Sequence, residues 1–223
     1  MSESSRTAKS IKNAKVALIF YFINLVLQFF SRKVFLDYLG AEVLGLNTTA
    51  QNLIGFLNLA ELGIGGAIAF TLYKPIYEKN TQVINEIVSV QGWLYRRVAY
   101  VVIVGACILM CFFPLIFEKA EVPLWYAYGS FSVLLVSTLL SYFVNYRQIV
   151  LTADQKEYKI TLNIQGFKVI KVILQIFVIS YLSNGYVHWM ILELLMSVTT
   201  AIALDKLLKR EYPWLKTVVN DGD

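Results

Sequence analysis

Apolar residues gather along the chain in six blocks, each long enough to cross a lipid bilayer as a helix. We place them at Ala14–Phe30, Leu44–Tyr73, Val98–Phe117, Trp125–Val150, Ile160–Tyr181 and Tyr186–Leu204. The second and fourth blocks are longer than a crossing requires, so we expect their ends to project or tilt. The pattern predicts an all-α membrane protein, a bundle of six transmembrane helices.

Composition agrees with this class. Hydrophobic residues make up 57% of the chain, charged residues only 16%, and the mean hydropathy is +0.60. A soluble domain carries about a quarter charged residues. The first block is too long for the apolar region of a signal peptide, so we take it as the first span. We therefore expect a basic tail at 1–13, a six-helix unit at 14–206, and a tail or linker at 207–223.

The basic residues flanking the blocks predict the orientation. They concentrate in the N-terminal tail, the second and fourth loops and the C-terminal tail, whereas the other loops hold only Arg32, Lys33 and Lys119. Because basic residues stay on the cytoplasmic side, both termini are expected there. The formal net charge of +5 then reflects topology, and no nucleic-acid partner is implied.

Polar residues recur on one face of most blocks with a helical period. The first block carries Asn24, Gln28 and Arg32, and the second carries Asn47, Gln51, Asn58 and Glu61. The fourth carries Ser137, Ser141, Asn145 and Gln148, and the sixth carries Glu193, Ser197 and Thr200. Such stripes either join helices by hydrogen bonds or line a cavity.

The fifth block contains two lysines at membrane depth, Lys168 and Lys171, on the face of Gln175. A charge at this depth is costly, so it usually faces a bundle interior or a wet cavity. With Arg32, these lysines would form a cationic lumen for something negatively charged. Glu61 and Glu193 would neutralise a lysine or carry a proton in coupled transport; pairing alone remains the alternative.

No cofactor is expected, although a coupling ion, H⁺ or Na⁺, is compatible with the pattern. Cys107 and Cys111 stand alone in the third block and are read as small packing residues. The sequence holds one histidine and no phosphate loop or catalytic triad, which disfavours an enzyme. The glycine-rich stretch Glu61–Ala67 marks either a hinge or close helix packing.

The segment from Arg32 to Pro75 reads RKVFLDYLGAEVLGLNTTAQNLIGFLNLAELGIGGAIAFTLYKP. It resembles the N-terminal region of O-antigen-type flippases of the polysaccharide-transport family, relatives of multidrug and toxin extrusion transporters and lipid II flippases. The likeness rests on Tyr38-Leu39-Gly40 after a basic residue, Leu44 to Asn47, Leu59 to Gly65 and Leu72 to Pro75. The stretch from Leu151 to Lys156 is similar to a later loop of that family.

The resemblance implies one lobe of a two-lobe transporter that moves an undecaprenyl-pyrophosphate-linked oligosaccharide across the inner membrane. Family members are about twice as long, which implies a fragment, a half-transporter that pairs with a second lobe, or a remnant. Besides this substrate and membrane lipids, that second lobe is the expected partner. The alternatives are a drug or ion exporter of the same superfamily, and a non-transporting scaffold subunit for polysaccharide assembly.

Overall fold

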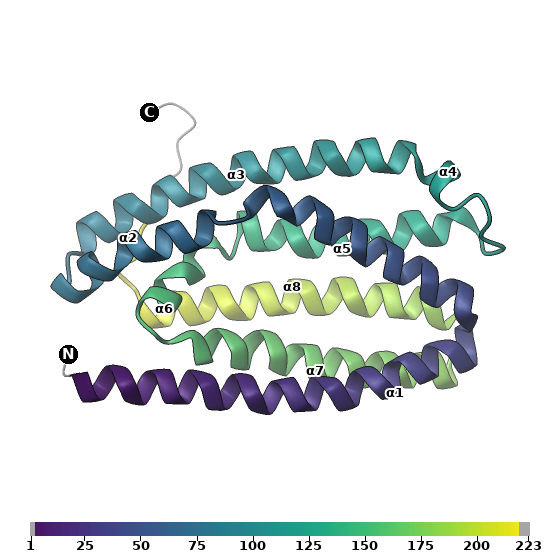
Figure 1. Ribbon diagram of the computed structural model, residues 1–223, viewed down its shortest axis with the longest axis horizontal. Coiled ribbons are helices and arrows are strands. Elements are labelled where there is room, and N and C mark those ends of the chain that lie inside the picture. The colour runs from purple at the N-terminus through teal and green to yellow at the C-terminus, as the bar shows by residue number, and fades with distance from the viewer. Residues whose placement is uncertain (1–2, 219–223) are drawn as a thin grey trace.

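The computed structural model describes residues 3–218, and every regular element among them is helical (Figure 1). In chain order these elements are α1 (Glu3–Leu57), the 3₁₀ turn η1 (Asn58–Glu61), α2 (Ile64–Glu78), α3 (Thr81–Cys111), α4 (Phe113–Ile116), α5 (Leu124–Phe143), η2 (Tyr146–Gln148), α6 (Ile149–Ala153), α7 (Glu157–Tyr181) and α8 (Gly185–Glu211). Among the described residues, five helices are long and apolar enough to cross a membrane: α1, α3, α5, α7 and α8.

Helix α1 is not straight, because Gly40 has φ 85° and ψ 166° within it. Only glycine adopts this conformation readily, since a side chain would collide with the backbone. The chain turns at this residue and runs back along the bundle (Figure 1). The bend brings the polar residues before and after Gly40 onto two neighbouring helical segments.

The expected helix bounds need correction in three places. The second block, Leu44–Tyr73, is not one helix, because η1 and the left-handed Gly63 (φ 87°) separate α1 from α2. The fourth block ends as a helix at Phe143 rather than Val150. Arg32 and Lys33 lie inside α1, and Arg96 and Arg97 lie inside α3, rather than in loops.

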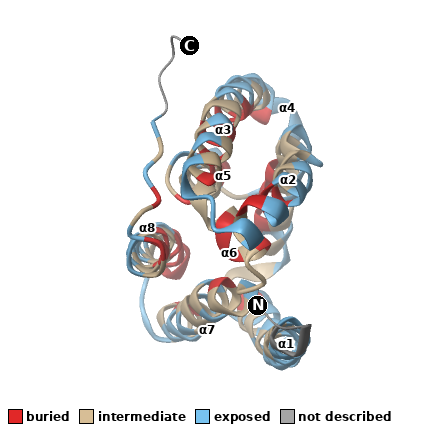
Figure 2. Cartoon of the chain, turned by 90° about the vertical axis from the view of Figure 1, so that its left-hand side faces the viewer, coloured by how far each residue is buried: buried red, intermediate tan, exposed pale blue. Residues whose placement is uncertain are grey.

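Two apolar clusters occupy opposite ends of the bundle. One surrounds Phe35, Phe131 and Trp189, and the other surrounds Leu72, Leu151 and Leu204. Along α7 the first cluster includes Ile179 with Val178 packed against it, and the second includes Ile160, so the segment between Ile160 and Val178 belongs to neither. Helix α7 packs along both α1 and α8, while α5 packs against α8, α1 and α3 (Figures 1 and 2). The polar stripes of these helices meet in the middle of the bundle.

The chain enters and leaves the bundle at the same end. Helix α1 begins, and α8 finishes, at the left of Figure 1, where the α2–α3 and α6–α7 connections also lie. The turn at Gly40 and the α4–α5 and α7–α8 connections lie at the other end. Most basic residues outside the middle of the bundle therefore belong to elements at one end, which is the asymmetry that the sequence predicts.

Candidate functional site: a cationic pocket between α1, α7 and α8

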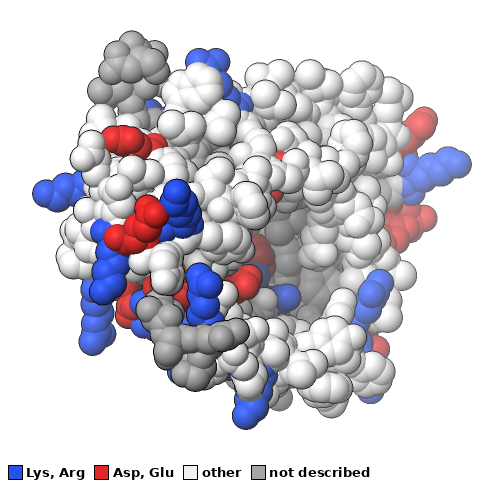
Figure 3. All heavy atoms as spheres, turned by 60° about the vertical axis from the view of Figure 1, so that its left-hand side comes forward, with Lys and Arg blue, Asp and Glu red and all other residues white. Residues whose placement is uncertain are grey.

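A pocket of about 280 Å³ lies between the two segments of α1, α7 and α8. This cationic pocket, as we call it, holds three basic side chains, those of Arg32, Lys168 and Lys171, and one acidic side chain, that of Glu193. Its volume far exceeds the roughly 10–15 Å³ that one water needs, so it can hold several waters or a polar ligand. Figure 3 shows one hollowed face of the molecule, with charged side chains visible in the hollow.

The structure brings together all but two of the site residues expected from the sequence. The pocket is lined by Asn24, Gln28, Arg32, Asn47, Gln51, Lys168, Lys171, Gln175 and Glu193, with apolar and hydroxyl side chains between them. Asn24 donates to Gln165 Oε1 at 2.9 Å, which ties α1 to α7 beside the pocket. Residues separated by more than 100 positions in sequence thus share one polar surface.

Asn58 and Glu61 are not among the residues that line this pocket, which corrects the expectation from the sequence. Asn58 Oδ1 accepts a hydrogen bond from Tyr142 of α5 at 3.1 Å. Glu61 Oε1 accepts from the hydroxyl of Tyr95 on α3 at 2.6 Å and from the backbone N–H of Gly65 at 3.2 Å. Both side chains therefore join the break between α1 and α2 to the neighbouring helices. Nothing in the spacing of the sequence indicates that Tyr95 is the partner of Glu61.

Glu193 is the one acidic residue among the described residues that line the pocket, and both of its carboxylate oxygens have partners. It is only 7% exposed, and its Oε1 pairs with Lys171 Nζ at 2.7 Å. Its Oε2 accepts from Gln175 Nε2 at 2.8 Å, and the same amide group lies 3.3 Å from the carbonyl oxygen of Trp189. A buried carboxylate needs such partners, because water no longer stabilises its charge. Glu193 therefore neutralises Lys171, one of the two roles considered for it.

Three other groups in the pocket are left without such partners. Among the described residues, neither Lys168 nor Arg32 has an ion-pair partner, and both side chains are exposed at the pocket. Asn47 is 6% exposed, and its Oδ1 is buried without a hydrogen-bond partner. Buried polar atoms are nearly always satisfied, so this amide oxygen requires a donor from within the pocket. The pocket thus has an excess of positive charge and an unused acceptor.

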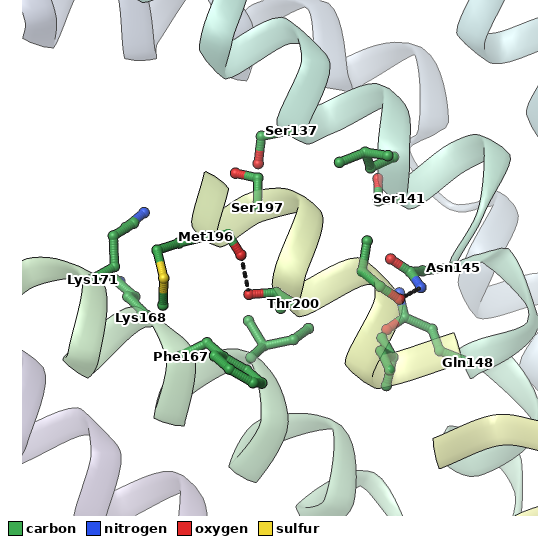
Figure 4. Close-up of a pocket in the computed structure, with 14 residues that line it drawn as sticks. Ser137, Ser141, Asn145, Gln148, Phe167, Lys168, Lys171, Met196, Ser197 and Thr200 are labelled. Atoms are coloured by element: carbon green, nitrogen blue, oxygen red, sulfur yellow. Dashed lines mark hydrogen bonds between the residues drawn. The ribbon is translucent and has the colours of Figure 1, made fainter. Parts of the chain in front are cut away.

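A second cavity of about 210 Å³ adjoins the first and shares Lys168 and Lys171 with it. It lies between α5, η2, α7 and α8 and is lined by polar side chains of these elements, including Ser141 of α5, Gln148 of η2 and Thr200 of α8 (Figure 4). For these stripes the sequence left helix contact and cavity lining open. Both occur, since Asn145 donates to the carbonyl of Ala201 at 3.0 Å and also lines the cavity.

An ion-pair cluster joins α1, the α6–α7 connection and the end of α8. Asp154 lies 3.5 Å from Lys9 Nζ and 2.8 Å from Lys156 Nζ, and accepts from the Tyr212 hydroxyl at 2.7 Å. Burial alone would raise the pKa of Asp154, but the hydrogen bonds from Lys156 and Tyr212 outweigh it and the pKa lies below its usual value. Glu211 pairs with Lys159 in the same cluster. These contacts hold one end of the α1–α7–α8 group together.

Within residues 3–218, no group of three or more His, Cys, Asp or Glu side chains is placed to hold a metal ion. Cys107 and Cys111 are exposed on α3, so the expectation that they pack inside the protein is wrong. Exposed thiols on an apolar helix fit a surface that faces lipid, where a small, weakly polar side chain is tolerated.

The fold and the pocket describe a helical, multi-pass membrane protein with a polar site between its helices. Comparison with family models, curated proteins and solved structures finds no match to this chain.

Proposed function

We propose that this chain is one lobe of a membrane carrier for a lipid-linked oligosaccharide whose lipid and sugar are joined through a pyrophosphate. The observation that carries the proposal is the cationic pocket, where Arg32 and Lys168 lack acidic partners among the described residues. Such cations at membrane depth are costly unless an anion compensates them. A pyrophosphate offers several strong acceptors to these groups, in charge-assisted hydrogen bonds.

In this proposal α1 crosses the membrane twice, once on each side of Gly40, giving six crossings with both termini in the cytoplasm of a bacterial cell. The bend at Gly40 and the common end of α1 and α8 support this count. The six helices supply one wall of the transport path, and a second lobe supplies the other. The pocket then alternates between the two membrane faces as the lobes rock against each other.

The pocket also distinguishes this proposal from a cation exporter. Its three basic groups outnumber its one acidic group, and that carboxylate is already paired with Lys171. A cationic drug would meet repulsion from Lys168 and Arg32, with no free carboxylate in the pocket to offset it. An anionic substrate avoids this repulsion.

The proposal is tested by binding of farnesyl pyrophosphate to the chain in lipid nanodiscs, with farnesol as the uncharged comparison. We expect Lys168→Gln to weaken binding of the pyrophosphate by roughly 10- to 100-fold, the value of one hydrogen bond to a charged group. Binding of farnesol should not change. Lys74→Gln is the matched control, because Lys74 is an exposed lysine that lies outside the pocket and makes a 3.8 Å pair with Glu78. Equal binding of the pyrophosphate by wild type and Lys168→Gln would refute the anion site.

A further inference from the structure

The cavity beside the cationic pocket has a hydrogen-bonding character of its own. Figure 4 shows side chains of α5 and α8 turned toward the space between them, with Lys168 and Lys171 on α7 at one side. The cavity therefore continues the cationic pocket along the bundle, and any ligand that reaches from one into the other passes the two lysines. The polar side chains of α5, η2 and α8 form the far wall of the cavity and determine which chemical groups it binds.

Three of the four hydroxyl groups in this wall, all but that of Ser137, have already used their hydrogens. Thr200 Oγ1 donates to the carbonyl of Met196 at 2.6 Å, Ser197 Oγ to that of Glu193 at 2.7 Å, and Ser141 Oγ to that of Thr138 at 2.6 Å. A hydroxyl carries one hydrogen and two lone pairs. Each of these side chains therefore offers the cavity an acceptor and no donor.

The amide groups of the wall add two oxygens as acceptors, and the Nε2 of Gln148 adds donors. The Nδ2 of Asn145 donates to the backbone of Ala201 at 3.0 Å, which leaves its amide oxygen as the remaining polar atom. The Oε1 of Gln148 is buried and has no hydrogen-bond partner among the described residues. A buried acceptor without a partner lowers the stability of the folded protein until a donor reaches it. The wall is therefore rich in acceptors that require donors from the ligand, while the Ser137 hydroxyl and the Nε2 of Gln148 can donate in return.

We infer that this cavity is a subsite for the hydroxyl groups of an uncharged sugar unit next to the anionic group of the substrate. A sugar ring carries several hydroxyl donors that match the acceptors of Thr200, Ser141 and Gln148. A second anion fits less well, because most polar atoms of the far wall present lone pairs and the two lysines are shared with the cationic pocket. A small cation does not fit, because the ammonium groups of Lys168 and Lys171 lie in the same cavity. The inference rests on the proposed function, since it assigns the second part of the same substrate.

The test compares two lipids, a short-chain polyprenyl pyrophosphate and the same lipid carrying one glucose, bound to the chain in nanodiscs. The wild-type protein should bind the glucosylated lipid more tightly. The variant Thr200→Val/Gln148→Leu should lose about 5- to 50-fold in affinity for the glucosylated lipid, as expected for two neutral hydrogen bonds, and less than 2-fold for the other lipid. Per-O-methylation of the glucose should have the same effect on the wild type, because it removes the donors.

Thr199→Val is the matched control. Thr199 is the neighbour of Thr200 and also donates to its own helix, to the carbonyl of Leu195 at 2.8 Å, but it is exposed and does not line the cavity. It should leave binding of both lipids unchanged, and thermal unfolding of all variants verifies that they are folded. If glucose adds nothing to the affinity of the wild type, the sugar subsite is refuted and the cavity holds water only. If neither lipid binds, the anion site of the proposed function fails with it.

Discussion

Lys168 and Lys171 lie three residues apart on one helix face, yet their surroundings differ. Lys171 is paired with the buried carboxylate of Glu193, whereas Lys168 has no ion-pair partner among the described residues. Lys171→Met leaves the charge of Glu193 uncompensated, which costs about 3–5 kcal/mol for a buried pair. Lys168→Met removes a charge that has no ion-pair partner, so it should not lower the free energy of unfolding. Thermal unfolding in detergent measures both effects.

The double variant Lys171→Met/Glu193→Gln separates loss of the pair from loss of packing. Glutamine keeps the shape of Glu193 and can still accept from Gln175, but it brings no buried charge, so much of the stability should return. Equal destabilisation by Lys171→Met and Lys168→Met would contradict the assignment of Lys171 as the structural lysine and Lys168 as the group available to an anion.

The sequence predicted most of the pocket because helical spacing places residues on faces. Asn24, Gln28 and Arg32 recur every four residues within one unbroken segment of α1, so their common face was predictable. Asn58 and Glu61 would lie on the face of Asn47 and Gln51 only if the helix continued through them. They lie in η1 instead, so they leave that face. The rotation of α8 against α7 decides whether Lys168 or Lys171 contacts Glu193. The spacing of residues within one helix does not determine that rotation.

The break between α1 and α2 depends on a close approach at Gly65. A Cβ at this position would lie 2.9 Å from Glu61 Oε1 and 3.1 Å from the Tyr95 hydroxyl. Gly65→Ala would therefore disturb the Glu61–Tyr95 hydrogen bond and should destabilise the protein by about 1–3 kcal/mol. Gly66→Ala is the control, because nothing lies within 4 Å of its Cβ and alanine favours helix. Chemical unfolding compares the two, and equal stability of both variants would show that the break tolerates a side chain.

The cluster around Asp154 should make one end of the α1–α7–α8 group sensitive to acid. The pKa of Asp154 lies below its usual value in the folded protein, so its ionised form stabilises the fold above the unfolded pKa of about 3.9. This contribution is lost as the pH falls through the lower, folded pKa. At pH 7, Asp154→Asn should therefore increase hydrogen exchange at the start of α1, where Lys9 contacts Asp154.

The effect of Asp154→Asn should vanish as the pH falls below the lowered, folded pKa of Asp154, where the wild-type carboxyl group is also protonated. Glu78→Gln serves as the control, because its pair with Lys74 is exposed and such pairs contribute little. If Glu78→Gln increased hydrogen exchange at the start of α1 at pH 7 as much as Asp154→Asn does, the Asp154 cluster would have no special part in holding α1.

Helix ends were harder to predict than helix existence. An apolar block indicates where a helix can lie in lipid, but polar residues extend the helix beyond it. Helix α3 has 31 residues and is about 46 Å long at 1.5 Å per residue, more than the roughly 30 Å of a bilayer core. Arg96 and Arg97 lie at its middle, and Asn80 caps its start by accepting from the N–H of Val83. The sequence contains that cap, but hydropathy alone assigns the region to a loop.

The polar site of the whole molecule is open on one side. Gln28, Arg32, Gln51 and Lys168 line the cationic pocket and are nevertheless exposed. Groups of this kind cannot face lipid without a large free-energy cost, so another protein surface or water must cover them in the membrane. Repeat-built transporters provide such a surface through a second bundle, which rocks against the first around the shared site.

Residues 1–223 alone should therefore insert into the membrane without moving lipid-linked sugar. The assay is restoration of surface glycan in a strain that lacks its own lipid-linked oligosaccharide flippase, with a complete two-lobe flippase as the positive control. Crosslinking in the same cells reports whether the chain is monomeric, and a folded, membrane-inserted monomer that restores glycan would overturn the need for a second lobe. Restoration by a dimer would instead identify a second copy of the chain as the other wall, and Arg32→Gln together with Lys168→Gln should then abolish it, because both copies would lose the groups that face the anion.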